Sequence, residues 1–524
     1  MSDNLDPARR PRPRPGRRAE GGIGSWRNAS PLAKAALALV LILAVTVVAV
    51  VRDDETPSTP ISDPTPTATA ASSSKTLPPA TTTTTATAEP TELPESTAEP
   101  TELPEPTATP RAVIECPEDC LVRVAALDAA AVAKLASSGI RPAYVGGGLL
   151  WGAAERPVID RLAADGTELT VVLPDNGTLP LYVVRFREEV DEEAAEQIGE
   201  IVDRSDRQVL VRADVLPPPI AALAARGIAV EKVPPPRPRI RERPDRPRLV
   251  DAAELVDSVS DEEIERTIRD LQSIGVDDDE LGSREMADRG NAIAADYLFR
   301  RMAALGVTVR YDDFVGDDGS YATNVVGELP GDDAGRGFLV VAHYDSMNDA
   351  GGPSPGADDN ASGVAAMVEI ARVLSGYRLP YPVQFVALTG EEVGFQGART
   401  FVANLDDRTY VAAYNVDAVG SPVRREQIVI NAGANSAELL TLLDEVNAEF
   451  EIGDELLLRQ NELIVADDNT LRTAGIPAVL ITRAVLGDSE VHHTADDVID
   501  NMDVPSVGRV ATLILLGLTV QLNE

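Results

Sequence analysis

The three histidines of this 524-residue chain, His343, His492 and His493, all stand beside acidic residues. His343 opens the segment HYDS, which contains Asp345, and the histidine pair opens HHTADD (492–497). Imidazole and carboxylate groups are ligands that Zn²⁺ and similar divalent cations bind well. A lone histidine is more often a structural residue than a ligand, but carboxylates beside all three favour metal chemistry.

The elements that must position these groups are apolar runs that predict buried strands. GRGFLVVAH ends at His343, PVQFVALTG leads to Glu391 and Glu392, YVAAYNV leads to Asp417, and PAVLITR precedes His493. Between the first two runs lie the Gly- and Asp-rich loop GADDNASG and the amphipathic pattern VAAMVEIARVL, which predicts a helix. The acidic groups therefore follow strands of a β/α alternation, at the edge where open α/β sheets place ligands.

A merely solvated acidic surface is the alternative, but unpaired charge directly after core strands is costly. The set instead fits a pair of divalent cations about 3.5–4 Å apart that share a carboxylate.

Five motifs carry a resemblance to a known family. HYDS, GADDNASG, GEEVGFQGA, NVDAVG and HHTADD occur in the order and rough spacing of the co-catalytic di-zinc aminopeptidases, whose relatives include glutamate carboxypeptidase II and the glutaminyl cyclases. The resemblance covers about residues 258–524. It implies two Zn²⁺ and a three-layer zinc-exopeptidase-like α/β domain, with a mixed β-sheet flanked by helices.

The resemblance also implies which residues hold the metals. Asp359 is expected to bridge both zinc ions, with His343 and Asp417 completing one site and Glu392 and His493 the other.

The remaining catalytic roles follow from the same resemblance. Glu391 is expected to be the general base that takes a proton from the attacking water and passes it to the leaving amine. Asp345 is expected to orient a ligand imidazole. The bond between Asp359 and Asn360 is expected to be a cis peptide.

Two positions depart from the family pattern. His492 stands where many members carry a tyrosine that helps to hold the oxyanion; it could donate the same hydrogen bond or point away from the metals. The segment 466–480 resembles the family's Ser-Asp-His-x-x-Phe stretch, with Asp467 kept and Asp468 in place of the histidine. Because of these departures, the resemblance does not define the substrate pocket.

The resemblance predicts a zinc aminopeptidase that removes N-terminal residues from peptides. A glutaminyl-cyclase-like acyltransferase, a carboxypeptidase of the same family and a non-catalytic binding module are the alternatives. Residues 251–524 contain 18 Arg, no Lys and 50 acidic residues, which suits a free α-amino group better than a substrate carboxylate.

The N-terminal part predicts membrane attachment. Residues 1–34 carry a net charge of +5, and 35–51 form an apolar run that nearly spans a bilayer core of about 30 Å. The basic flank indicates a cytoplasmic tail, with the catalytic domain outside. The alternative is a cleaved signal peptide and a secreted protein. Residues 52–111, rich in Thr and Pro, predict a disordered stalk.

Residues 112–236 predict a small α/β domain with internal repeats, in which 121–145 resembles 209–233. It has no cluster of catalytic residues, and a Pro/Arg linker at 237–248 separates it from the predicted peptidase domain at 249–524. Cys116 and Cys120 predict a disulfide, with free thiols as the alternative.

The net charge of −38 argues against nucleic acid as a partner. The oligomeric state stays open.

Overall fold

The structure is a computed structural model of the whole chain. It describes residues 116–524 apart from the stretches 117–118, 127, 175–179, 188, 206, 214–222, 225, 238–245, 276–281, 422–426, 461–465 and 484–489. The described residues all fall in one compact unit, 106–524. The predicted tail (1–34), anchor (35–51) and stalk (52–111) lie outside the described residues.

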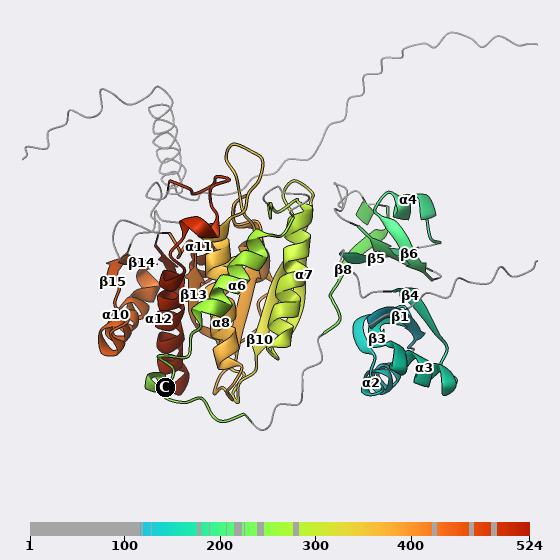
Figure 1. Cartoon of the computed structure of the whole chain (residues 1–524), viewed down its shortest axis with the longest axis horizontal. Helices are drawn as coiled ribbons and strands as arrows, with labels where there is room; N and C mark the ends of the chain where they lie inside the picture. Colours follow the sequence, from blue (N-terminus) through green and yellow to red (C-terminus); the bar gives the residue numbers. More distant parts are fainter. Residues whose placement is uncertain are drawn as a thin grey trace, which may run out of the picture. The chain divides into compact units, whose positions relative to one another are not determined.

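An eight-stranded mixed sheet forms the centre of the C-terminal domain (Figure 1). Its middle strands β12, β11, β13 and β16 run parallel, and an antiparallel strand follows on each side. The strand order is β15-β14-β16-β13-β11-β12-β10-β9. The strands are β9 (Thr308–Val315), β10 (Tyr321–Leu329), β11 (Arg336–His343), β12 (Val383–Leu388), β13 (Thr409–Val416), β14 (Gln427–Ala432), β15 (Glu455–Arg459) and β16 (Ala478–Thr482).

Helices cover both faces of this sheet because its strands bury side chains on both faces. On β11, Phe338 and Val340 belong to the core under one helical layer, whereas Leu339 and Val341 belong to the core under the other. The larger layer contains α6 (Asp261–Gln272), α7 (Arg289–Ala304), α8 (Gly363–Leu374), α10 (Ala437–Phe450) and α12 (Val504–Asn523), and the smaller one α9 (Gln396–Ala403) and α11 (Asp467–Thr473). The predicted mixed sheet flanked by helices is therefore confirmed.

Among the described residues, α12 alone is long and apolar enough to cross a membrane. Its most apolar stretch is 67% buried, and the helix packs against α6, α8 and α10. The apolar surface of α12 is thus used in the core of the C-terminal domain.

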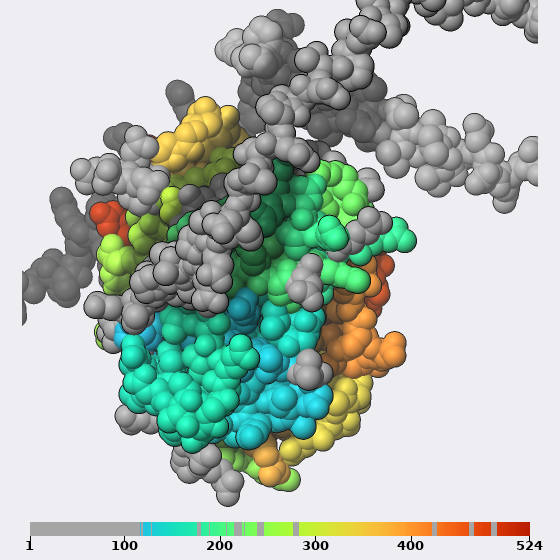
Figure 2. Space-filling view, turned by 90° about the vertical axis from the view of Figure 1, so that its right-hand side faces the viewer, coloured from blue at the N-terminus to red at the C-terminus, as the bar shows by residue number. Residues whose placement is uncertain are grey.

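The N-terminal described region contains two small antiparallel sheets, whose side chains form much of the face in Figure 2. The first has the order β2-β3-β1-β4 and the second the order β6-β7-β5-β8, which is the same arrangement repeated. It is the strand order of β-α-β-β-α-β, ferredoxin-like units. The elements are β1 (Asp119–Ala125), α2 (Ala129–Ser137), β2 (Arg141–Gly146), β3 (Leu149–Glu155), α3 (Arg156–Ala164), β4 (Leu169–Leu173), β5 (Leu181–Phe186), α4 (Glu192–Glu196), β6 (Glu200–Arg204), β7 (Gln208–Arg212) and β8 (Ile228–Val233).

We call these units the first repeat (119–173) and the second repeat (181–233). One buried cluster joins the two sheets, with Trp151 from the first repeat and Leu210 from the second. Arg123 and Asp203 pair across the same junction at 2.9 Å.

The structural repeat has a different register from the one predicted from sequence. The similar segments 121–145 and 209–233 contain β1-β2 and β7-β8, which occupy different places in the two strand orders. Each segment nevertheless runs from one strand to a later strand of the same sheet. The two segments can therefore have similar sequence patterns without being equivalent in the structural repeat.

The predicted disulfide between Cys116 and Cys120 is confirmed. Cys120 lies in β1 and is fully buried. The bridge therefore closes a small loop where the described part of the first repeat begins.

Candidate metal centre

The structure brings the predicted ligands together at the carboxyl ends of the parallel strands. His343 is the last residue of β11, and Asp417 directly follows β13. Glu391 and Glu392 come shortly after β12, and His493 lies in the segment after β16. The β/α order of the chain thus delivers groups from four separate strands to one edge of the sheet.

Asp359 reaches this edge from the helical turn Ala357–Ser362, just before α8. Its Oδ1 lies 3.3 Å from His343 Nε2, and the same nitrogen lies 3.3 Å from Asp417 Oδ1. Ligands that bind zinc tetrahedrally at 2.0–2.2 Å stand about 3.3–3.6 Å from one another. The contacts of His343 with Asp359 and with Asp417 therefore both have the spacing of ligands around one zinc ion.

The second oxygen of Asp359 faces a second set of donors. Asp359 Oδ2 lies 3.4 Å from His493 Nε2, which lies 2.9 Å from Glu392 Oε2. Asp359 thus contributes one oxygen to each set, the arrangement that a bridging carboxylate requires. The His493–Glu392 contact is shorter than the spacing of two zinc ligands, so this second set would have to open slightly around an ion.

Glu391 also lies close to the first set. One of its carboxylate oxygens is within 4.8 Å of donor atoms of both His343 and Asp417. This position suits either a base beside the metals or a further ligand, and substitution of Glu391 can separate the two roles.

The loop that carries Asp359 is held in place through its backbone. The N–H groups of Asp358 and Asp359 donate to the two oxygens of Asp497, at 2.8 and 3.0 Å. The peptide bond between Asp359 and Asn360 is cis, as the resemblance implied. Asp497 belongs to the HHTADD motif, which gave no sign of its role as a clamp.

Arg284 is a second support, and no motif in the sequence indicated it. It is fully buried, and its guanidinium donates to the carbonyl oxygens of Tyr344, Pro355 and Gly356 at 2.5–2.9 Å. Burial lowers its pKa to about 10 despite the surrounding carboxylates. Sequence reasoning missed this arginine because its partners are backbone atoms distant along the chain.

Asp345 joins the first donor set to the Glu391 loop. Its Oδ1 lies 3.4 Å from His343 Nδ1, the nitrogen that does not face the metal position. Its two oxygens accept hydrogen bonds from the N–H groups of Glu391 and Glu392, both at 3.3 Å. Asp345 is buried, so it can fix the tautomer and orientation of the imidazole.

Asp349 makes the corresponding contact to His493. Its Oδ1 lies 3.3 Å from His493 Nδ1, and its N–H donates to the His493 carbonyl oxygen at 3.1 Å. Its side chain is 71% exposed, whereas that of Asp345 is 1% exposed. The imidazole of His493 is therefore held by a carboxylate that is largely exposed to solvent.

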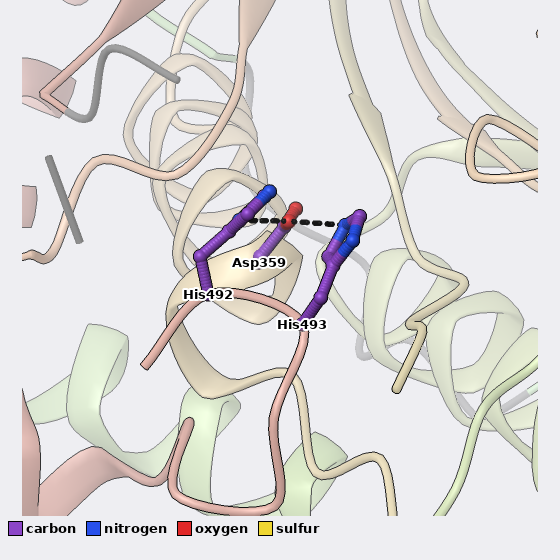
Figure 3. Close-up of side chains that lie close together, drawn as sticks. All are labelled: Asp359, His492 and His493. Atoms are coloured by element: carbon purple, nitrogen blue, oxygen red, sulfur yellow. Dashed lines mark ion pairs between the residues drawn. The ribbon is translucent and has the colours of Figure 1, made fainter. Parts of the chain in front are cut away.

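His492 points toward Asp359 (Figure 3). Its Nδ1 lies 2.9 Å from Asp359 Oδ2, and its ring stacks on that of His493 with centroids 3.8 Å apart. The pKa of Asp359 is held well below its usual value, because hydrogen bonds from His343, His492 and His493 outweigh the effect of burial.

Three other acids around the centre show the opposite shift. Burial and neighbouring carboxylates raise the pKa of Glu391, Glu392 and Asp467. Both oxygens of Asp467 and Oε1 of Glu392 are buried and make no hydrogen bond within the described part of the chain. This excess of buried negative charge is what divalent cations would neutralise.

An open α/β sheet that carries two candidate donor sets sharing one carboxylate is an arrangement suited to a pair of metal ions. Residues 324–517, which are less than half of the chain, match the model of peptidase family M28.

Two curated relatives and one solved structure illustrate the likeness. A probable zinc metalloprotease from Pyrenophora teres f. teres (strain 0-1) is 33% identical over 192 residues, which cover 33% of this chain and 41% of that protein. Leucine aminopeptidase 2 from Trichophyton rubrum is 36% identical over 133 residues, covering 23% and 26%. The aminopeptidase from Aneurinibacillus sp. strain AM-1 aligns over 51% of this chain and 95% of its own, at 15% identity and a TM-score of 0.44. The chain thus spans less than half the length of these two curated relatives.

The unequal burial of Asp345 and Asp349 predicts unequal effects on metal binding. We expect Asp345→Asn to weaken zinc binding about 10- to 100-fold, as is typical when a group that orients a ligand is lost. Asp349→Asn should weaken it less, because water can replace an exposed partner. Competition with a chromogenic chelator measures both affinities; a larger loss in Asp349→Asn would contradict the assignment.

Proposed function

We propose that this protein is a membrane-anchored zinc aminopeptidase that hydrolyses N-terminal residues of peptides outside the cytoplasm. The observation that carries the proposal is the shared carboxylate: Asp359 offers one oxygen to each donor set, and Glu391 stands beside the first. The match of residues 324–517 to the model of peptidase family M28 supports hydrolysis of peptides.

In this proposal His343, Asp359 and Asp417 hold one Zn²⁺, and Asp359, Glu392 and His493 hold the other. When bound, the two ions supply Lewis acidity that activates water and polarises the scissile carbonyl. Asp345 and Asp349 orient the two ligand imidazoles, and Asp497 and Arg284 hold the loop of the shared carboxylate.

Glu391 is the general base. Its carboxylate lies beside the first donor set, and the Glu391 N–H is tied to Asp345. From there it takes a proton from the attacking water and delivers it to the leaving amine, whose departure breaks the C–N bond. Proton transfer by such a positioned group typically contributes 10²–10⁴-fold to the rate.

The aminopeptidase specificity is supported by the arginines around the centre. Arg284 is bound to carbonyl oxygens, Arg472 pairs with Asp468 at 2.9 Å, and Arg483 pairs with Asp454 at 3.2 Å. Each of these three arginines thus already has a partner inside the domain, and none of the three is free to bind a substrate carboxylate. A carboxypeptidase would need such a cation to hold the C-terminal carboxylate of its substrate.

Metal content distinguishes the aminopeptidase from an acyltransferase and from a binding module. A glutaminyl-cyclase-like acyltransferase would use one zinc ion, whereas the two donor sets favour two. A non-catalytic binding module is disfavoured because every expected ligand type is present. The metal stoichiometry of the purified protein separates these possibilities.

The membrane location rests on the sequence of residues 1–51 alone. An uncleaved anchor predicts that the mature chain retains its N-terminal residues and fractionates with membranes. Mass spectrometry of the protein from its native host tests this, and a mature N-terminus after residue 51 would instead indicate secretion.

Replacing each of the two adjacent glutamates by glutamine in turn should separate catalysis from metal binding. We expect Glu391→Gln to lower kcat at least about 100-fold while two zinc ions stay bound, because it loses the base and no ligand. Glu392→Gln serves as the matched control and should lose zinc. Loss of zinc in Glu391→Gln, measured by elemental analysis, would mean that Glu391 is a ligand.

We further propose that His492 stabilises the oxyanion in place of the family's tyrosine. His492→Phe keeps an aromatic ring against His493 but removes the donor, so we expect kcat to fall about 10²-fold or more, with KM changing little. His492→Tyr should recover part of the rate. Unchanged kcat in His492→Phe would show that His492 serves only the bridging carboxylate.

The substrate class is tested with peptides that differ only at their ends. We expect the full-length protein to cleave peptides with a free α-amino group and to lose this activity after treatment with a chelator. N-acetylated peptides should resist cleavage, and C-terminal amidation should have no effect. Cleavage of the blocked peptides alone would contradict the aminopeptidase proposal.

A further inference from the structure

The second repeat places a buried lysine against the C-terminal domain. The Lys232 side chain, on β8, is 1% exposed, and an ammonium group at such a depth needs a compensating charge. Its Nζ lies 2.8 Å from Asp296 Oδ1 and donates to the Ala292 carbonyl oxygen at 3.1 Å. Asp296 and Ala292 both belong to α7, so the ion pair joins the second repeat to the domain that carries the metal centre.

Aromatic contacts surround this ion pair. Lys232 Nζ lies over the rings of Tyr182 and Tyr311, 5.3 and 5.6 Å from their centroids. The Lys232 N–H donates to the Tyr321 hydroxyl at 2.9 Å, and the Tyr321 ring meets that of Tyr182 edge to face. These groups form a desolvated junction, which differs from the polar and accessible contacts typical of loosely tethered domains.

The junction is continuous with the supports of the metal centre. Lys232, Tyr182 and Tyr321 line a small cavity together with Asn291 and Tyr344. Tyr344 stands between His343 and Asp345 in the chain, and its hydroxyl donates to the Thr323 carbonyl oxygen at 2.6 Å.

Asn291 makes a second connection to the centre. Its Nδ2 donates to Thr389 Oγ1 and to the Arg284 carbonyl oxygen, at 2.8 and 2.9 Å. Thr389 lies two residues before Glu391. Helix α7 and strand β10 form part of the surface that receives Lys232. Their hydrogen bonds also hold the loops that carry the predicted ligands.

We propose that the second repeat is a permanent brace of the metal centre, so that the functional unit includes residues 181–233 as well as the predicted domain from residue 249 onward. The surface formed by Ala292, Asp296, Tyr311 and Tyr321 takes the chain's own second repeat as its partner. Without that partner, Asp296 would be left without its lysine and two tyrosine rings would be exposed. The brace acts by holding α7 and β10, and it does not depend on which peptides are cleaved.

The first test asks whether the second repeat stays bound without a covalent connection. A specific protease site is placed in the 238–245 stretch of the full-length protein and cut after purification. We expect the two pieces to co-elute in size-exclusion chromatography with zinc still bound. Separation of the wild-type pieces with no change in zinc affinity would overturn the proposal.

The second test removes the buried charge in the uncut protein. Lys232→Met should raise amide hydrogen exchange in β10 and α7 at least about tenfold and weaken zinc binding about tenfold. Adding Asp296→Asn, which removes the charge that Lys232 no longer balances, should restore much of both. The matched control is Glu231→Gln, which breaks an exposed pair with Arg185 on the same sheet and should change neither. Equal behaviour of Lys232→Met and Glu231→Gln would contradict the role of Lys232.

Discussion

The arrangement of the centre depends on the single carboxylate of Asp359. Its two oxygens face opposite donor sets, so its position decides whether the two metal positions can exist together. A shift of the loop by a fraction of an ångström would change both sets at once. This explains why two buried groups, Asp497 and Arg284, hold the backbone of this loop by hydrogen bonds.

The second constraint is electrostatic. Glu391, Glu392 and Asp467 lie close together in a buried region, and burial raises the pKa of each. Such a concentration of carboxylates is costly unless cations compensate it. The described arginines nearby contact carbonyl oxygens or other acids, so we infer that bound metal ions compensate the charge of these carboxylates. Metal binding and the integrity of this edge of the sheet are therefore coupled.

Much of the centre could be predicted because its chemistry is local in sequence. Four of the five predicted ligands lie at or after the end of an apolar strand, and the strand order places those ends at one edge of the sheet. The five motifs then predicted the role of each position. Arg284, Asp349 and Asp497 were missed because their roles depend on contacts between segments that are distant in the chain. Arg284, for example, binds carbonyl oxygens, and these leave no trace in residue type.

The N-terminal region was predicted less well for a related reason. Its strands and helices follow local patterns, but the register of its two repeats is set by sheet pairing over long sequence separations. The burial of Lys232 likewise depends on Asp296, 64 positions further along the chain. A lysine in an apolar strand is ordinarily expected to be exposed. Only the tertiary structure shows that it joins the second repeat to the metal-bearing domain.

The central claim is that one carboxylate, Asp359, bridges two zinc ions. Zinc K-edge X-ray absorption of the fully loaded protein tests it most directly, because a bridged pair produces a zinc–zinc signal. We predict two zinc ions per chain and a metal–metal distance of about 3.5–4 Å, with the signal lost in Asp359→Asn. A single zinc ion per chain, or two ions without a metal–metal signal, would contradict the account.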